Sequence, residues 1–179
     1  FFPHRTKGEG LFLALLRKTS AAPLFKEKKN KKRDGKQPAI KGGAAVANWL
    51  DHSNDFKLLR TDEAHIIAVR QTLADDVQRI CATIRALTAG VLLVEEKGKK
   101  LIPQHALALS TERAATAFPS VELSTAEALS YLRREAITLP PDAPRGYVVV
   151  CYKGHALGFV NNLGNRANNL YPQKWRIRN

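Results

Sequence analysis

Apolar and polar positions change their period several times between residue 46 and the end of the chain. Residues 56–59, 65–69 and 91–94 form short apolar runs bounded by polar positions, which is typical of β-strands. Asp75–Thr88 instead repeats its apolar residues with a helical period. Strands and short helices therefore interleave, at spacings too close for parallel βαβ crossovers. This order predicts an α+β fold of small, mainly antiparallel sheets with short helices on one side.

The predicted helix at Asp75–Thr88 has matching signals at both ends. Asp75 and Asp76 suit the positive end of the helix dipole, and Gly90 follows the last turn. The apolar positions that share one face are Val77, Ile80, Cys81, Ile84 and Leu87. Because Cys81 lies on that face, the pattern favours a packed thiol over a nucleophile.

Two Lys-Gly pairs predict tight hairpin turns. Lys97-Gly98 turns a buried strand back into Lys99–Ile102, and Pro103 can then open a short helix through Leu109. Lys153-Gly154 is a second two-residue loop, and Gly suits such a loop because it tolerates a positive φ. The apolar runs on either side of it are Tyr147–Tyr152 and His155–Val160.

Further elements are predicted after Pro119. Ser124-Thr-Ala-Glu127 is a capping-box pattern, so a helix should run from there to about Glu135. Trp175 and Ile177 alternate with arginines, as the residues of a half-buried strand do. The inward positions of the predicted helix are Ala128, Leu129 and Leu132.

The first 45 residues have a different character. Leu11–Leu16 is continuously apolar, which fits either a strand buried on both faces or one side of a core helix. Lys26–Arg33 holds six Lys or Arg in eight positions, so residues 19–45 are predicted to be a flexible basic linker. That linker either touches RNA phosphates or is simply solvated. The chain contains no Met, even at position 1, and we therefore expect it to be a piece of a longer protein.

Positive charge is concentrated at the two ends of the chain. The formal net charge is +13. Residues 1–41 hold 12 Lys or Arg against 3 acidic residues, residues 42–142 hold 11 against 13, and residues 143–179 hold 6 against none. Basic ends around a neutral middle predict contact with a polyanion, whereas a merely solvated basic surface is the alternative.

The sequence shows no catalytic centre of its own. It has no phosphate-binding Gly loop, its two Cys form no CxxC motif, and its five His lack metal-ligand spacing. His105 is interpreted as a core-edge histidine that bonds a backbone group rather than as a general base. No run of about 18 apolar residues is present, so we expect no membrane span. Cysteine usage predicts a reduced, cytoplasmic protein.

The tail from Ala143 is rich in amides and cations and lacks acidic residues, so it can donate many hydrogen bonds to phosphates and sugars. The cations predicted to contact RNA are Lys99, Lys100, Lys153, Arg166, Lys174 and Arg176, with Lys97 extending the track. The amides predicted to read RNA shape or 2′-hydroxyls are Asn162, Asn165, Asn168 and Asn169. Tyr171 or Trp175 would stack on a splayed base. In the alternative interpretation the amides satisfy backbone groups of a turn-rich cap, and Trp175 packs.

Three segments resemble one known family. Phe2–Lys18, with its Pro-His and Gly-Glu-Gly before an apolar run, resembles the last two strands of the catalytic domain of Sun/Fmu (RsmF-like) RNA cytosine-C5 methyltransferases. Leu157–Arg178 resembles the PUA-like RNA-binding domain at the C-terminus of these enzymes, and Lys99–Ser110 resembles the intermediate segment of their bacterial members. At Asn161 the family commonly has a Lys, which removes one expected phosphate contact.

This resemblance implies four regions. They are a methyltransferase remnant at 1–18, the basic linker at 19–45, an intermediate α+β subdomain at 46–118 and a PUA-like RNA-binding domain at 119–179. The implied parent enzyme uses S-adenosylmethionine to make 5-methylcytosine in ribosomal RNA, and its catalytic domain would lie in the same polypeptide. This chain lacks the family's Pro-Cys-Ser motif and Gly-rich cofactor loop, so no catalytic or cofactor residue is assigned. The alternative is a protein-interaction module that scaffolds the catalytic domain without touching RNA.

Overall fold

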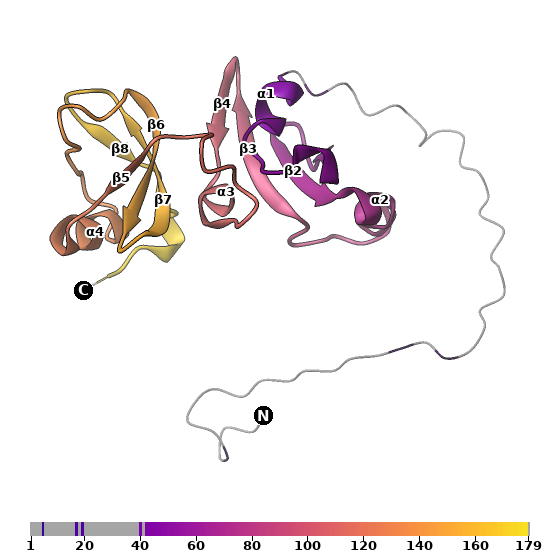
Figure 1. The fold of residues 1–179 in the computed structure, drawn as a ribbon. Coiled ribbons are helices and arrows are strands. Elements are labelled where there is room, and N and C mark those ends of the chain that lie inside the picture. The colour runs from indigo at the N-terminus through magenta and orange to yellow at the C-terminus, as the bar shows by residue number, and fades with distance from the viewer. Residues whose placement is uncertain (1–4, 6–16, 18, 20–39, 41, 179) are drawn as a thin grey trace. The chain divides into compact units, whose positions relative to one another are not determined.

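The computed structural model describes residues 5, 17, 19, 40 and 42–178 (Figure 1). The chain divides into two units, Phe1–Lys36 and Gln37–Asn179, and every helix and strand described below belongs to the second. The predicted methyltransferase remnant and most of the predicted linker lie outside the described residues. Both therefore stay predictions.

The first sheet is a four-stranded antiparallel meander in the order β1-β2-β3-β4. The predicted strands are confirmed. The turn predicted at Lys97-Gly98 lies one residue later, at Gly98-Lys99, because Lys97 still pairs with Lys100 at the end of β3; Gly98 has a φ of 62°. A short helix, α1 (Gly43–Ala47), precedes this sheet, and η1 (Ser53–Asp55) leads into it. The strands are β1 (Phe56–Arg60), β2 (His65–Arg70), β3 (Val91–Lys97) and β4 (Lys100–Pro103).

The helix predicted at Asp75–Thr88 is shorter than expected, and its apolar face is largely uncovered. After η2 (Gln71–Leu73), α2 spans Ala74–Thr83 and ends where Ile84 adopts an extended backbone. Val77 packs against the sheet, whereas Leu87 is 92% exposed. The burial predicted for the whole face is wrong because the pattern records which residues share a side, not whether that side has a partner. The other exposed members are Ile80, Cys81 and Ile84.

The predicted short helix after Pro103 is confirmed as α3 (His105–Leu109). Its residues contact β3 of the first sheet and β7 of the second. Leu107 and Ala108 are buried among residues of both sheets, so this one-turn element links them.

The second sheet has the order β5-β6-β7-β8. The predicted hairpin is confirmed, with Lys153 and Gly154 at φ values of 51° and 76° in its turn. The β5–β6 pair is parallel and the other two pairs are antiparallel. The strands are β5 (Ser120–Glu122), β6 (Gly146–Tyr152), β7 (His155–Asn162) and β8 (Ala167–Asn169).

The capping box predicted from Ser124 is present and starts α4 (Thr125–Leu132). The Ser124 hydroxyl accepts from the Glu127 N–H, and the Glu127 carboxylate accepts from the Ser124 N–H at 2.8 Å. The helix ends three residues before Glu135, and Arg134 has a left-handed φ of 64°. Leu129, predicted to point inward, is exposed, and Tyr131 is the fully buried residue instead.

The strand predicted at Trp175 and Ile177 is wrong. The segment forms η3 (Gln173–Trp175) followed by irregular backbone, and both side chains are exposed. The Ile177 N–H donates to the Leu132 carbonyl at 3.0 Å, which ties this segment to the end of α4 rather than to a sheet. A period of two over four residues was too short to decide between the two arrangements.

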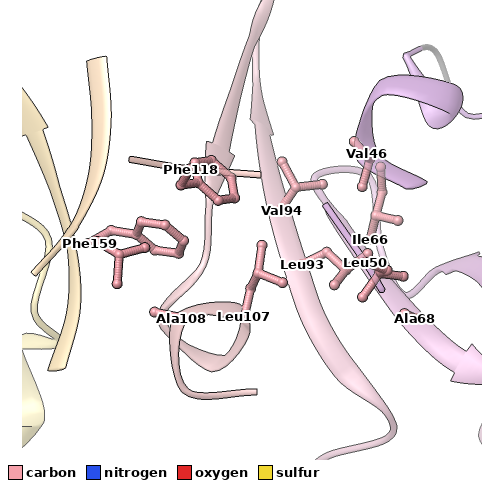
Figure 2. Close-up of a cluster of buried hydrophobic side chains, with 11 residues drawn as sticks. Val46, Leu50, Ile66, Ala68, Leu93, Val94, Leu107, Ala108, Phe118 and Phe159 are labelled. Atoms are coloured by element: carbon pink, nitrogen blue, oxygen red, sulfur yellow. The ribbon is translucent and has the colours of Figure 1, made fainter. Parts of the chain in front are cut away.

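One apolar cluster draws on both sheets. Figure 2 shows Leu93 and Val94 of β3 and Leu107 of α3 in this cluster. It also shows Phe118, which lies just before β5, and Phe159 of β7. Phe118 and Phe159 meet edge to face with ring centroids 4.8 Å apart. A second cluster, centred on Tyr131 and three valines of β6 and β7, lies between α4 and the second sheet. The α+β architecture of small sheets with short helices is thus confirmed, while the subdomain boundary near residue 118 stays a prediction.

Candidate nucleic-acid interface

The loop between β7 and β8 forms a basic corner of the second sheet. Asn162 at the end of β7 pairs with Gly146 on one side and with Ala167 on the other. Arg145 immediately precedes Gly146, and Arg166 immediately precedes Ala167. Both arginines therefore lie at the same end of the strands, beside the loop Leu163–Arg166. We call this set, Arg145, Gly164, Asn165 and Arg166, the basic corner.

Gly164 shapes the basic corner. Its φ is +96°, a conformation that suits glycine, and a Cβ there would lie only 3.0 Å from Nε of Arg145. The Arg145 side chain thus packs across the loop. Arg145, Asn165 and Arg166 are all exposed, and no salt bridge within the described range 42–178 involves either arginine. The corner offers exposed donors without a neutralising carboxylate, which is what a phosphate requires.

Asn162 and Asn169 have their amide groups engaged inside the protein. Asn162 is 4% exposed; its Nδ2 donates to the carbonyls of Ala143 and Pro144, and its Oδ1 accepts from the Gly164 N–H. Asn169 donates to two carbonyls at the end of α4 and accepts from the Tyr171 N–H. Asn165 and Asn168 are exposed. The four predicted amides therefore divide into two structural ones and two that face solvent.

Lys153 lies at the opposite end of the second sheet from the basic corner. It occupies the β6–β7 turn, where its Nζ lies 5.4 Å from the centroid of the Tyr152 ring. The acidic Glu122 is close by, since its carboxylate accepts from the Gly154 N–H at 3.3 Å. The seven residue-to-residue steps from His155 to Asn162 along β7 cover about 23 Å at about 3.3 Å per step. The structure therefore separates Lys153 from Arg166 by roughly the length of the strand.

Lys99 and Lys100 lie on the first sheet, in and beside the β3–β4 turn, and both are exposed. Strand pairing does not place these two lysines beside the basic corner, because the two sheets have no strand in common. The six predicted cations are thus distributed over three places: the β3–β4 turn, the β6–β7 turn, and the stretch from Arg166 to Arg176.

The segment after β8 forms a second basic surface. Lys174 and Arg176 are exposed on either side of Trp175, whose side chain is 61% exposed. Arg134 fixes this segment: its Nε donates to the Tyr171 carbonyl at 2.9 Å and its guanidinium also bonds the Gln173 side chain. Arg134 is therefore the arginine that holds the Tyr171 backbone. We call Lys174, Trp175 and Arg176 the tail surface.

His105 of α3 packs against the tail surface. Its ring meets the Tyr171 and Trp175 rings edge to face, each with centroids 5.2 Å apart. Its Nδ1 is buried without a hydrogen-bond partner, so the predicted bond from His105 to a backbone group is not made by this nitrogen. Burial lowers the pKa of the imidazole below its ordinary value, because the buried site disfavours the charged ring. A neutral ring with an unprotonated Nδ1 is the less costly way to leave that nitrogen unpaired.

Gly158 allows His105 and Tyr131 to come close to β7. Its φ is +151°, and a Cβ there would stand 2.1 Å from the Tyr131 hydroxyl and 2.8 Å from Nδ1 of His105. The Tyr131 hydroxyl donates to the Phe159 carbonyl at 3.2 Å, and burial raises its pKa well above the ordinary value. Only glycine fits between these two side chains and the strand.

Arg145 and Arg134 were missed by reasoning from the sequence. Arg145 could have been found, because it directly precedes the predicted hairpin and the hairpin register sets it opposite the end of β7. Nothing in the sequence indicates the bond from Arg134 to the Tyr171 carbonyl, since 37 residues separate them.

Neither a metal site nor a membrane-spanning helix is found in the described range. From residue 42 to 178, no group of three or more His, Cys, Asp or Glu side chains could hold a metal ion. Among the helices described, none has the length and apolar character needed to cross a bilayer.

Comparison with known proteins agrees with this picture. Residues 118–177 match the family described as Methyltransferase RsmF PUA domain. That range contains the whole second sheet, the basic corner and the tail surface, but not His105.

Several curated relatives align with nearly the whole chain. The protein named Ribosomal RNA small subunit methyltransferase F from Erwinia tasmaniensis is 27% identical over 184 residues, which cover 97% of this chain and 36% of that protein. The proteins of the same name from Shewanella loihica and Shewanella baltica (strain OS223) are each 28% identical, covering 96% of this chain and 36% of theirs. The chain thus spans little more than a third of the length of these relatives. Residues 118–177 thus match a PUA domain of the RsmF type, and the whole chain is similar to the PUA-bearing part of Sun/RsmF-like methyltransferases.

Proposed function

We propose that this chain is the RNA-binding part of an S-adenosylmethionine-dependent ribosomal RNA (cytosine-C5) methyltransferase that works in the cytoplasm. It would hold ribosomal RNA for a methyltransferase domain in the same polypeptide. The observation that carries the proposal is the PUA domain itself, whose β6, β7 and β8 ends bring Arg145 and Arg166 together without an acidic partner.

The chemistry of methyl transfer is assigned to residues beyond this chain. Neither Cys81 nor Cys151 stands in a Pro-Cys-Ser setting, and no Gly-rich loop that could cradle the methyl donor is present in the sequence. The task left to these residues is to bind and orient RNA. S-adenosylmethionine would supply the methyl group when bound to the catalytic domain.

Within this function the predicted contacts take unequal parts. Arg166, Lys174 and Arg176, together with Arg145, would bind phosphates, and Asn165 and Asn168 would bond sugars or base edges. Lys99, Lys100 and Lys153 would extend the contact if the RNA is long enough to reach the other two turns. Asn162 and Asn169 would act indirectly, by shaping the loop and the segment that carry the other contacts.

The salt dependence of binding tests the proposal. For the 179-residue chain and a ribosomal RNA stem-loop, about four phosphate contacts predict that log K falls with log salt at a slope near −3 to −4. Arg145→Ala and Arg166→Ala should each weaken binding about tenfold, as expected for a lost charged hydrogen bond, and should reduce the slope by about 1. The measurement is fluorescence anisotropy at several salt concentrations.

Arg79→Ala on α2 is the matched control, since Arg79 is also exposed and makes no salt bridge among the described residues. It should change neither affinity nor slope. A flat salt response, or equal effects of all three substitutions, would remove RNA binding at the basic corner. It would favour the competing function, a module that contacts the methyltransferase domain alone.

A further inference from the structure

Trp175 is a large aromatic side chain that the fold holds still and yet leaves exposed. The Trp175 ring meets His105 edge to face at 5.2 Å, while 61% of its surface remains open to solvent. The backbone is fixed on both sides: the Trp175 N–H donates to the Pro172 carbonyl, and the Ile177 N–H donates to the Leu132 carbonyl, each at 3.0 Å. An exposed indole held in this way has already lost much of the conformational entropy that stacking on a ligand would cost.

His105 in turn is held by the protein core. It begins α3, the element whose Leu107 and Ala108 are buried between the two sheets. Its Nδ1 approaches β7 at Gly158, where no Cβ intervenes, and Tyr171 packs against its ring. Trp175 therefore rests on a support that comes from outside the residues matched by the PUA family.

The surroundings of Trp175 are cationic. Lys174 and Arg176 adjoin it in the chain, and Arg134, at the end of α4, is bonded to the Tyr171 carbonyl and to Gln173 just before it. No salt bridge in the described range involves any of these three cations. An apolar protein partner would bury these charges unpaired, whereas a nucleic acid offers a flat base to the indole and phosphates to the cations.

We propose that Trp175, supported by His105, is a stacking site for an unpaired RNA base, and that Lys174 and Arg176 hold the phosphates on either side of that base. This proposal rests on the proposed function, since it names the RNA feature that the tail surface takes. A base inside a duplex is already stacked on both faces and cannot reach the indole. The PUA domain together with α3 would thus select RNA that contains a bulged or extruded nucleotide.

The test compares two RNA stem-loops with the same test nucleotide; one of them has an added nucleotide opposite it, so that the test nucleotide is bulged in the first RNA and paired in the second. The bulged nucleotide is 2-aminopurine, whose fluorescence falls when it stacks on an aromatic ring. We expect the wild-type chain to bind the bulged RNA about tenfold more tightly than the paired RNA, with quenching. Trp175→Ala should abolish both the preference and the quenching while the affinity for paired RNA stays within twofold. Trp175→Phe should keep part of each.

His105→Ala should reduce the preference without abolishing it, because the indole remains but loses its support. Leu87→Ala is the control for removal of an exposed apolar side chain, because Leu87 is 92% exposed and lies in the segment after α2, outside the PUA domain. It should leave both affinities unchanged. Melting temperatures of all variants separate loss of the site from loss of the fold.

The outcomes distinguish this inference from the function on which it rests. Equal affinity of the wild type for both RNAs, or a preference that survives Trp175→Ala, overturns the stacking site while salt-dependent binding leaves the proposed function intact. An equal loss of both affinities in Trp175→Ala also overturns it, since the indole would then be a general contact. Failure of the wild type to bind either RNA overturns both proposals.

Discussion

Asparagine side chains between Asn161 and Asn169 differ in role although their chemistry is identical. Asn162 is in the middle strand at the end of the sheet, where the carbonyls of Ala143 and Pro144 have no strand partner, and its amide satisfies both. Asn168 is in the short β8 and is exposed. Position in the register, and not residue type, therefore decides which amide is structural and which faces solvent.

Replacing these two residues should separate stability from RNA binding. Asn162→Ala leaves two carbonyls and one N–H without their partner in a buried place, so we expect the free energy of unfolding to fall by about 2–3 kcal/mol. Asn168→Ala should change it by less than about 0.5 kcal/mol. If Asn168 contacts RNA as proposed, its replacement weakens binding instead. Urea unfolding and anisotropy titration of both variants measure the two effects, and an undiminished stability of Asn162→Ala would contradict the structural role.

At the scale of elements, α2 has an apolar face that the rest of the described chain covers only in part. Ala74 is buried and Val77 packs on the first sheet, but the helix stops at Thr83 and the apolar residues after it remain in water. Cys81 lies on the uncovered part. Cys151 on β6 is half-buried instead, and burial, together with the Glu122 carboxylate, raises the pKa of its thiol.

The two thiols should therefore react at different rates. The thiolate is the reactive form, and a raised pKa lowers its fraction at pH 8, so Cys151 should react slowly on grounds of both access and ionisation. We expect one fast and one slow equivalent with an aromatic disulfide reagent, and raising the pH should accelerate the slow one. Cys81→Ser should remove the fast phase. A fast phase that persists in Cys81→Ser would contradict the exposure of Cys81.

At the scale of the molecule, the residues from Gln37 onward form one compact unit although they contain two separate sheets. Phe118 lies where the two sheets meet. Its ring centroid is 4.8 Å from that of Phe159 on β7 and 5.1 Å from that of Trp49. Figure 2 shows it beside Val94 of β3 in the same apolar cluster. A core shared in this way couples the two sheets, because neither can unfold without exposing the apolar surface of the other.

We therefore expect the two sheets to unfold in a single calorimetric transition. Phe118→Ala should destabilise the protein by about 3–5 kcal/mol, the usual cost of removing a buried phenyl ring. Phe56→Ala on β1 is the control, since Phe56 is only partly buried and should cost less. Two resolved transitions in the wild type, or a loss confined to one sheet in Phe118→Ala, would show that the sheets are independent.

Local signals account for the parts of the fold that could be predicted. The capping box at Ser124 and the Lys153-Gly154 turn were predicted because a few neighbouring residues fix their own φ, ψ and hydrogen bonds. Much of the candidate site could not be predicted from the sequence, because its geometry depends on pairing between distant residues. Arg145 and Arg166 lie at the same end of the second sheet although they are far apart in the sequence. The same is true of the ring contact between His105 and Trp175.

By itself the sequence determined the α+β class, the strands of both hairpins, and an acid-free tail suited to a polyanion, since these follow from period, turn chemistry and composition. Only the tertiary structure decided which apolar face is covered, which asparagines are engaged, and where each cation lies. The physical reason is that a residue's pattern describes its own side of an element, whereas burial and hydrogen bonding depend on what another element brings against that side.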